Sequence, residues 1–455
     1  MKNNNIYILS EYFKREFHSN ILVSLLAANK NFNIYIGSDR VYKKLIKQNL
    51  LSPGIFHTKS ISHGKKKTIF NKTLYKKKFI LTSIDEEHGV LDTGSFEDFF
   101  IKPRMNKEDL KYFDAIFCWG NYDYKKFVKF FKLDKKFFLT GSPRVDLWKK
   151  NFNSIWHQKE DDKKNILIVS NFSFCNNLYP LSEIIRRREN EGYYKRSPKL
   201  KKQELSYYSY QKKLIYKFID LIAFLSKELS SEKILFRPHP TENIDFWKKE
   251  LQIFQNVKIC EKGVLSTLIS KSDIIIQNGC TSSLEAFISG KRVIDYHPIQ
   301  NTGNKFGEFA KEFSINAKNK EQVIKIILSK NKTVNKLKQK KVNNRMIYLD
   351  KVLSSEKIVK IWRKLIPNGF NYFDNNHLKI RLNLFLFDFF NYYITLVILI
   401  LKRKQHLKNI IFHKFSGAQD FAINKYLLDL KRILKIKKNI KISRLGKEFI
   451  SITSK

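Results

Sequence analysis

The chain has 455 residues, of which 43% are hydrophobic, and it contains only 16 Gly and 9 Pro. This composition supports packed cores, excludes a collagen-like, Gly/Pro-rich or wholly disordered chain, and at this length predicts two or three domains. The 87 Lys and Arg against 42 Asp and Glu give a net charge of +45, spread along the chain. We predict no specific nucleic-acid partner and keep an anionic membrane surface as an alternative partner.

The amino terminus and the cysteines indicate a cytoplasmic location. The first ten residues, MKNNNIYILS, are followed at once by charged residues, so no apolar run is long enough for a signal peptide. Four cysteines lie far apart without a C-x-x-C pair, which argues against a disulfide framework or a structural zinc site. We predict a cytoplasmic protein, with peripheral attachment at the inner face of the plasma membrane as the alternative.

Strand and helix patterns alternate through the first third of the chain. An apolar strand over 5–9 is followed by a helix over 11–30 and a strand over 33–37. Further strands are predicted, in chain order, at 78–83, 115–119 and 137–140. The alternation predicts a parallel sheet covered on both faces, so residues 1–150 are predicted to form a Rossmann-like domain.

A polar stretch over 151–164 marks a domain boundary, after which the alternation begins again. Further strands and helices are predicted, in chain order, at 165–170, 201–229, 233–236, 246–251, 257–260, 264–270, 273–277, 283–289 and 292–296. We predict a second Rossmann-like domain over 165–365, and an α/β fold in which two parallel sheets face each other across a cleft. Ligands then bind beyond the carboxyl ends of the strands.

Residues 319–365 are predicted to be helical and to return across the interface, and 366–455 to form a helical, apolar and basic extension. Twenty mostly apolar residues over 382–401 end at Lys402-Arg403-Lys404, as a membrane span does. Asp388 near their centre opposes a span by roughly 2.5–3.5 kcal/mol, so a span, an interfacial helix and a buried core helix remain alternatives. Residues 402–455 carry a net charge of +12, which favours an anionic membrane surface or is simply solvated.

A first candidate site follows the strand over 233–236, in the sequence Arg237-Pro238-His239-Pro240. The two prolines fix the backbone around His239 at a strand's carboxyl end, so the imidazole is expected to point into the cleft. It can then donate to a phosphate oxygen, and Arg237 can add a charge-assisted pair. A structural loop histidine is the alternative.

A second candidate follows the strand over 273–277. Gly279 permits a tight turn, and three hydroxyl residues, Thr281, Ser282 and Ser283, then open a helix whose free N–H groups suit an anion. Glu285 is placed to accept from ribose hydroxyls, although the spacing of Ser282 and Glu285 also fits a capping box. Together the two segments are predicted to place a cation, an imidazole and a helix start on adjacent strand ends.

These motifs, RPHP and then NGCTSSLEA about forty residues later, resemble bacterial surface-carbohydrate biosynthesis proteins. That family belongs to the wider GT-B group, with capsule Kdo transferases, polysialyltransferases and CDP-glycerol glycerophosphotransferases. The resemblance covers roughly 5–300 and implies that His239 and the hydroxyls of 281–283 hold the phosphates of a donor nucleotide, with Glu285 nearby. Cys280 departs from the pattern, because a small hydroxyl residue is expected there. Smaller matching pieces are Glu11-x-x-x-Arg15-Glu16, Asp85-Glu86-Glu87-His88-Gly89, Trp119-Gly120, Gly141-Ser142-Pro143-Arg144-Val145-Asp146 and Ser170-Asn171-Phe172-Ser173, with a weaker one at 413–417.

The amino-terminal half is then expected to hold the acceptor and the general base. Asp85, Glu86 and Glu87 follow the strand over 78–83, and three adjacent carboxylates cannot all ionise freely if buried. One of them would therefore have a raised pKa suited to proton transfer, while a solvated acidic turn is the alternative. No Asp-x-Asp occurs, so we predict no metal site and no cofactor beyond the nucleotide-activated sugar.

The sequence thus predicts a metal-independent glycosyltransferase of GT-B type. It would move a sugar from a nucleotide-activated donor to a surface polysaccharide or glycolipid acceptor at the cytoplasmic side. Three alternatives stay open: a CDP-glycerol-type glycerophosphotransferase, an enzyme similar to UDP-sugar 2-epimerases, and a non-catalytic basic protein that binds a membrane or RNA.

Overall fold

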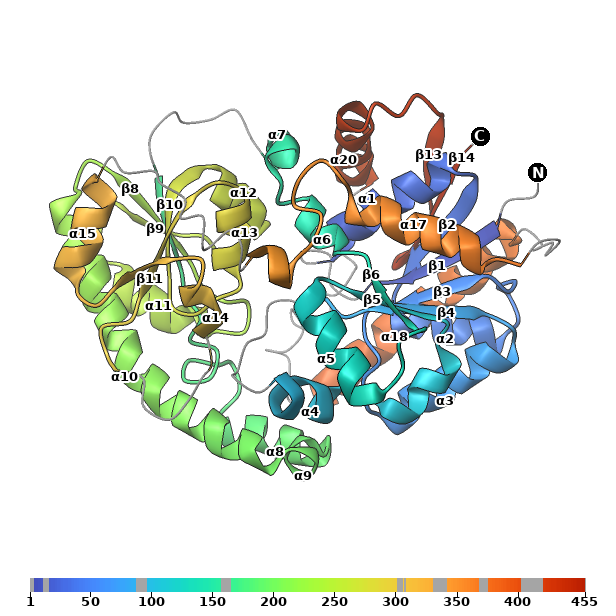
Figure 1. The fold of residues 1–455 in the computed structure, drawn as a ribbon, viewed down its shortest axis with the longest axis horizontal. Helices are drawn as coiled ribbons and strands as arrows, with labels where there is room; N and C mark the ends of the chain where they lie inside the picture. The colour runs from blue at the N-terminus through green and yellow to red at the C-terminus, as the bar shows by residue number, and fades with distance from the viewer. Residues whose placement is uncertain are drawn as a thin grey trace.

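The computed structural model describes residues 4–10, 16–86, 96–156, 165–300, 306, 308–329, 342–367, 375–401 and 420–454. Two α/β lobes lie side by side, each built on a sheet whose main strands are parallel (Figure 1). The predicted fold class is therefore confirmed. All four cysteines are free.

The amino-terminal sheet has eight strands in the order β13-β14-β2-β1-β3-β4-β5-β6. Its central strands are apolar on both faces because helices cover both sides, and all six residues of β2 are buried. β1 and β2 run parallel, with Asn4 opposite Phe32 and Leu9 opposite Gly37. The strands are β1 (Asn4–Leu9), β2 (Phe32–Gly37), β3 (Ile55–Thr58), β4 (Ile80–Ile84), β5 (Ala115–Cys118), β6 (Phe137–Leu139), β13 (Ile440–Gly446) and β14 (Phe449–Ser454).

Helices of this lobe pack on both faces of its sheet. The first of them is buried on almost every side, between the sheet and later helices of the chain. The helices are α1 (Phe17–Asn29), α2 (Asp39–Lys47), α3 (Lys65–Lys76), η2 (Glu97–Ile101), α4 (Lys102–Arg104), η3 (Lys107–Tyr112), α5 (Asn121–Phe131), α6 (Pro143–Asp146), η4 (Lys150–Phe152) and α7 (Asn153–Trp156).

The carboxyl-terminal sheet has six parallel strands in the order β12-β11-β10-β7-β8-β9. They are β7 (Asn165–Val169), β8 (Lys233–Arg237), β9 (Val257–Ile259), β10 (Ser272–Gln277), β11 (Arg292–Tyr296) and β12 (Ile315–Ala317). The helices are α8 (Leu181–Asn190), α9 (Tyr193–Arg196), α10 (Pro198–Glu228), α11 (Ile244–Leu251), α12 (Leu265–Ser270), α13 (Ser282–Ile288), α14 (Glu308–Lys311) and α15 (Lys320–Leu328). One prediction is wrong: β7 lies between β8 and β10, so the two motif-bearing strand ends are not adjacent.

After the second lobe the chain returns to the first, where α17 (Ser354–Leu365) lies beside α1 (Figure 1). Asp146, at the end of α6, is fully buried and its carboxylate accepts from the backbone N–H groups of Ser354 (3.0 Å) and Ser355 (2.9 Å). It also pairs with the buried Lys149 at 2.9 Å. The carboxylate thus caps α17. The predicted helix over 319–365 is confirmed at α15 and α17, whereas residues 346–353 are not helical.

The carboxyl-terminal extension differs in part from the prediction of a helical tail. Its helices are α18 (His377–Leu401) and α20 (Asp420–Ile433), and the chain then forms the antiparallel hairpin β13–β14, which joins the edge of β2. The exposed positions of the hairpin are charged. In the sequence, its alternation of buried and exposed residues therefore reads as part of a basic tail, and the strands were not predicted. Across the described ranges, none of the helices combines the length and apolar composition that a bilayer crossing requires.

Replacing Asp146 by Ala tests the tie between α6 and α17. We expect the free energy of unfolding to fall by about 3–5 kcal/mol, because the change leaves Lys149 buried without its carboxylate. Asp39→Ala is the matched control, since Asp39 pairs with Lys43 on the surface and its loss should cost under about 1 kcal/mol. Urea unfolding followed by circular dichroism measures both, and equal losses would contradict the assignment.

Candidate functional site

Three loops leave the carboxyl ends of β8, β7 and β10, in that order across the sheet. Parallel strands all end at one edge, so these loops form one rim of the carboxyl-terminal lobe. The first holds His239, the second 170–173, and the third leads into α13. The predicted donor-site residues therefore share one rim. Between them lies the loop over 170–173, which matched the family pattern in sequence but was not assigned to the site.

His239 is oriented by a residue of its own loop. Its Nδ1 lies 2.8 Å from Thr241 Oγ1 and accepts from the backbone N–H of Thr241 at 3.3 Å. Because a backbone amide can only donate, Nδ1 is the acceptor, and a neutral ring carries its proton on Nε2. The Nε2–H is therefore the group of this side chain that can donate to an anion.

Arg237 is anchored within its own lobe. Its guanidinium donates to the carbonyl oxygens of Cys260 (2.7 Å), Lys262 (3.1 Å) and Gly263 (3.0 Å). The side chain is buried, and burial lowers its pKa. These bonds direct the guanidinium to the loop between β9 and α12, so Arg237 holds the shape of the rim.

The start of α13 is held by Gln277. Its Oε1 accepts from the backbone N–H groups of Gly279 and Cys280, both at 2.6 Å. Gly279 has a φ of +84°, which favours glycine. Gln277 holds these two amides, so the next N–H groups at this helix start are those of Thr281 and Ser282. The Ser282 N–H also lies within hydrogen-bond reach of Cys280 Sγ.

The hydroxyl residues at this helix start differ in their surroundings. Thr281 is exposed and Ser282 is buried, with no hydrogen-bond partner for its hydroxyl among the described residues. Ser283 Oγ donates to the carbonyl of Cys280 at 2.8 Å. The predicted capping box does not form, because Thr281 is the N-cap residue without a side-chain cap bond, and the Glu285 carboxylate accepts from Ser266 instead.

Arg144 of the amino-terminal lobe acts electrostatically on Glu285 of the other lobe and was not among the predicted site residues. Its Nη1 donates to the carbonyl of Glu86 at 2.9 Å, and the guanidinium lies 5.4 Å from the Trp148 ring. Burial raises the pKa of Glu285, and the positive charge of Arg144 partly offsets this increase. The motif Gly141 to Asp146 was the sequence signal for this residue, but only the folded chain places it between the lobes.

Two of the three predicted acceptor-side carboxylates are buried after β4, with exposed fractions of 8% for Asp85 and 7% for Glu86. Asp85 Oδ2 lies 3.4 Å from Arg104 Nη2, and its carbonyl accepts from Trp119 Nε1 at 2.8 Å. A solvated acidic turn is therefore wrong for these two residues, while Glu87 lies outside the described residues. Within the described ranges, no three His, Cys, Asp or Glu side chains cluster as metal ligands do.

Glu242 ties the rim loops together, and sequence reasoning missed this role. Its carboxylate accepts from Ser170 Oγ (2.8 Å), the Phe172 N–H (2.7 Å) and Trp247 Nε1 (2.6 Å). The neighbouring Asn171 N–H donates to Asn278 Oδ1 at 2.8 Å, which links the β7 loop to the β10 loop. All three loops are thus cross-linked. Burial raises the pKa of Glu242 to about 7.

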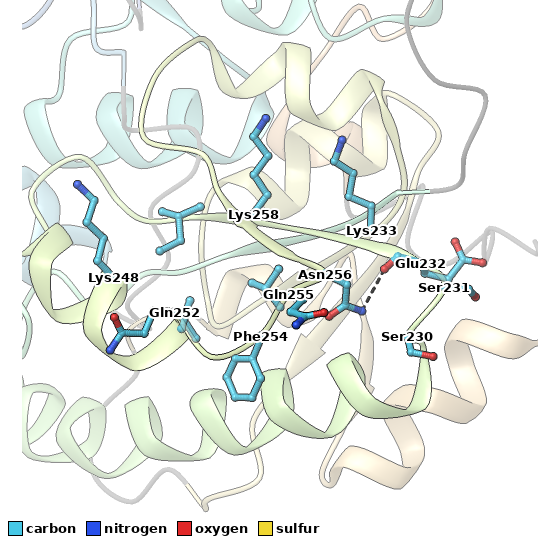
Figure 2. Close-up of a pocket in the computed structure, with 13 residues that line it drawn as sticks. Ser230, Ser231, Glu232, Lys233, Lys248, Gln252, Phe254, Gln255, Asn256 and Lys258 are labelled. Atoms are coloured by element: carbon cyan, nitrogen blue, oxygen red, sulfur yellow. Dashed lines mark hydrogen bonds between the residues drawn. The ribbon is translucent and has the colours of Figure 1, made fainter.

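A surface hollow of the described chain lies away from this rim. It has a volume of about 810 Å³ and is lined by the turn from α10 into β8, the end of α11 and the edge strand β9 (Figure 2). That turn precedes β8, so the hollow borders the opposite end of the strand from the rim. Lys248 on its wall is paired with Glu261 at 2.8 Å. We therefore do not assign it to the candidate site.

Two lobes with parallel sheets, and a rim of loops facing the other lobe, define a GT-B fold. No protein-family model matches the chain, and no curated protein matches its sequence. The UDP-GlcNAc 2-epimerase from Methanocaldococcus jannaschii superposes with a TM-score of 0.50 at 15% identity, over 79% of this chain and 99% of its own. Another UDP-N-acetylglucosamine 2-epimerase gives 0.50 at 12%, over 81% and 99%. The wall teichoic acid polymerase TagF gives 0.44 at 12%, over 79% and 88%. At these identities, the two epimerases establish the shared fold.

Glu242→Gln tests the buried carboxyl group through pH. The wild-type carboxyl keeps its proton up to about pH 7 when folded, whereas the unfolded chain releases it near 4.5. Between these two pH values the folded state binds more protons than the unfolded state. The contribution of this carboxyl group to the free energy of unfolding is therefore lost as the pH rises from 4.5 to about 7. The advantage of the wild type over Glu242→Gln should therefore shrink by about 2–3 kcal/mol between about pH 5 and about pH 7.5.

Urea unfolding of both chains at the two pH values measures this change. The exposed Glu228 supplies a control, since Glu228→Gln should leave the pH dependence of the wild type intact. A constant difference between wild type and Glu242→Gln across the window would refute the raised pKa.

Proposed function

We propose that the protein is a GT-B-type glycosyltransferase that moves a sugar from a nucleotide-activated donor to a surface polysaccharide or glycolipid acceptor at the cytoplasmic side. One observation carries the proposal. The loop of His239, the β7 loop and the start of α13 are hydrogen-bonded into one rim. Arg144 of the other lobe, which donates to the carbonyl of Glu86, acts electrostatically on Glu285 in α13.

The rim is assigned to the donor phosphates. His239 donates through Nε2–H to one phosphate, and the amides of Thr281 and Ser282 donate to the other. β8 and β10 are two strand spacings apart, about 10 Å, a gap that a nucleoside diphosphate can bridge. α13 has only seven residues, so its helix dipole is small. It would bind phosphate mainly through these N–H groups and through the hydroxyls of Thr281 and Ser282.

The remaining donor-site residues have supporting roles in this assignment. Arg237 keeps the rim in shape through its three carbonyl partners, and Gly279 provides the turn that brings the α13 amides to the rim. Ser283 closes that turn, while Glu285 accepts from a ribose hydroxyl through the oxygen that does not meet Ser266. Arg144 adds positive charge on the side of the other lobe.

The acceptor is assigned to the rim of the amino-terminal lobe. A carboxylate among Asp85, Glu86 and Glu87 takes the proton of the acceptor hydroxyl, whose oxygen then bonds to the anomeric carbon of the donor. The bond from that carbon to the phosphate oxygen breaks, and the nucleotide leaves with the electron pair. Positive groups at the rim stabilise its charge. The proposal assigns no metal and no further cofactor.

A UDP-sugar 2-epimerase is the second candidate, because the two similar structures with a TM-score of 0.50 are epimerases. A CDP-glycerol-type transferase would use the same rim with a different donor. An epimerase converts UDP-N-acetylglucosamine without any acceptor, whereas both transferases require one. Incubation with UDP-N-acetylglucosamine, CMP-sugars and CDP-glycerol, each with and without acceptor, separates the three.

Nucleotide binding tests the donor site directly. We expect at least one of CMP, CDP, UDP, GDP and ADP to raise the melting temperature by roughly 2–4 °C at about a hundred times its dissociation constant. His239→Ala should weaken that nucleotide about tenfold, because one hydrogen bond to a charged phosphate is lost. His63→Ala is the control, since His63 bonds to the carbonyl of Lys102 in the other lobe.

A protein that no nucleotide stabilises would rule out all three enzyme candidates. Equal nucleotide affinity in wild type and His239→Ala would rule out the imidazole as a phosphate ligand and leave the rest of the rim to be tested.

Turnover tests the general base. With the donor found in the nucleotide panel, we expect Asp85→Asn or Glu86→Gln to lower release of the nucleotide by about a hundredfold or more. The same variant should keep the wild-type thermal shift with nucleotide, because the base lies in the lobe opposite the phosphates. Wild-type rates in both variants would exclude these two residues.

A further inference from the structure

The largest apolar surface feature of the described chain is one face of α18. Two aliphatic residues of this helix, Ile380 and Leu384, are fully buried, and Phe387 and Asp388 are half-buried on the same side. The opposite side presents Leu378, Leu382, Phe385, Leu386, Phe389, Phe390, Tyr393, Ile394, Val397, Ile400 and Leu401, each more than half exposed. These are eleven of the 21 large exposed hydrophobic residues described, and they form a stripe at helical spacing. A contiguous stripe of this size marks an interaction surface.

The packed side fixes which face of α18 points outward. Leu384 fills the space at Gly446, where an added Cβ would lie 2.8 Å from its Cδ1. Asp388 Oδ2 accepts from the backbone N–H of Lys447 at 2.8 Å. Lys44 on α2 lies 4.5 Å from the centre of the Phe387 ring. The hairpin and α2 therefore hold the helix in one orientation.

The charges around α18 identify what the exposed face meets. Asp388 is the only acid in the helix and lies on the packed side, so the apolar stripe holds no carboxylate. Lys379 and Arg381 are exposed in the first turns, and Lys441 is exposed on β13 beside the helix. The sequence continues beyond α18 with Lys402-Arg403-Lys404. An apolar stripe flanked by cations matches a layer of anionic lipid.

A second copy of the chain fits this face poorly. Each copy carries a net charge of +45, so two apolar stripes could meet only by bringing two strongly cationic surfaces together. An anionic bilayer instead gains from the same charges, and its acyl region covers the apolar side chains.

We propose that α18 is an interfacial membrane anchor. The helix lies in the plane of the membrane, with its exposed face at the boundary between head groups and acyl chains, and its flanking Lys and Arg contact anionic phosphates. Its 25 residues extend about 38 Å along the surface. The proposal depends only on this surface and not on the activity assigned to the rim.

Vesicle flotation with the full chain tests the anchor. We expect the wild type to float with vesicles of phosphatidylglycerol and phosphatidylcholine in equal parts, and much less with phosphatidylcholine alone. Leu382→Ser/Phe385→Ser/Phe389→Ser should weaken this binding at least about tenfold, with an unchanged circular dichroism spectrum because all three side chains are exposed. Tyr216→Ser/Ile253→Ser/Leu328→Ser removes three equally exposed apolar side chains elsewhere and should bind like the wild type.

A second variant tests the contribution of the positive charges to membrane binding. Lys379→Gln/Arg381→Gln should weaken binding to the anionic vesicles by about fivefold for each residue, and high salt should weaken the wild type as well.

Three results would overturn the proposal: a wild type that does not float with anionic vesicles, equal binding by the α18 triple variant, or equal binding to vesicles of phosphatidylcholine alone. A concentration-dependent dimer in sedimentation, lost in the α18 variant and without lipid binding, would assign the face to a second copy instead.

Discussion

The carboxyl group of Glu242 is the contact on which the candidate site depends. It lies buried among a hydroxyl, a backbone amide and an indole N–H that come from the β7 loop and from α11. All three donors are buried away from water, so a shift of one loop would leave them without a hydrogen-bond acceptor. His239 is three residues before Glu242 in the same short loop, and its place on the rim follows from this anchor.

The segment 143–146 is one of several places where the two lobes meet, and the contact of Arg196 with the carbonyl of Pro103 is another. Arg144 donates to the carbonyl of Glu86, and its charge acts on the carboxyl group of Glu285. Asp146, two residues later, caps α17, the helix that follows the return of the chain from the second lobe. Because Arg144 and Glu285 belong to different lobes, any change in lobe orientation must change their separation. The segment 143–146 therefore couples the shape of the cleft to the electrostatics of the donor rim.

Local patterns predicted most of the fold, and sheet order limited the prediction of the site. Runs of apolar residues identify strands that are buried on both faces, such as β1 and β10, without any knowledge of their neighbours. β3 was missed because it has four residues and includes His57, whose ring bonds to Thr82 of β4 only once the sheet is formed. The position of β7 between β8 and β10 is likewise a tertiary fact. The partners of Arg237 could not be predicted either. An arginine can donate to carbonyl or to phosphate oxygens, and the sequence does not show that the loop over 260–263 lies next to this side chain.

The carboxylate of Asp388 separates the alternatives that the sequence left open for α18. Burial of an unpaired carboxylate costs free energy both in a bilayer and in a protein core. From the sequence alone, Asp388 therefore argues against burial of this helix in either environment. The hairpin β13–β14 gives it a backbone N–H donor on one side, so the acid and the apolar stripe come to lie on opposite faces. The contact that gives Oδ2 of this carboxylate its donor thereby turns eleven large hydrophobic side chains outward. A helix held in this way is amphipathic through its tertiary contacts, which no periodicity in residues 382–401 alone would reveal.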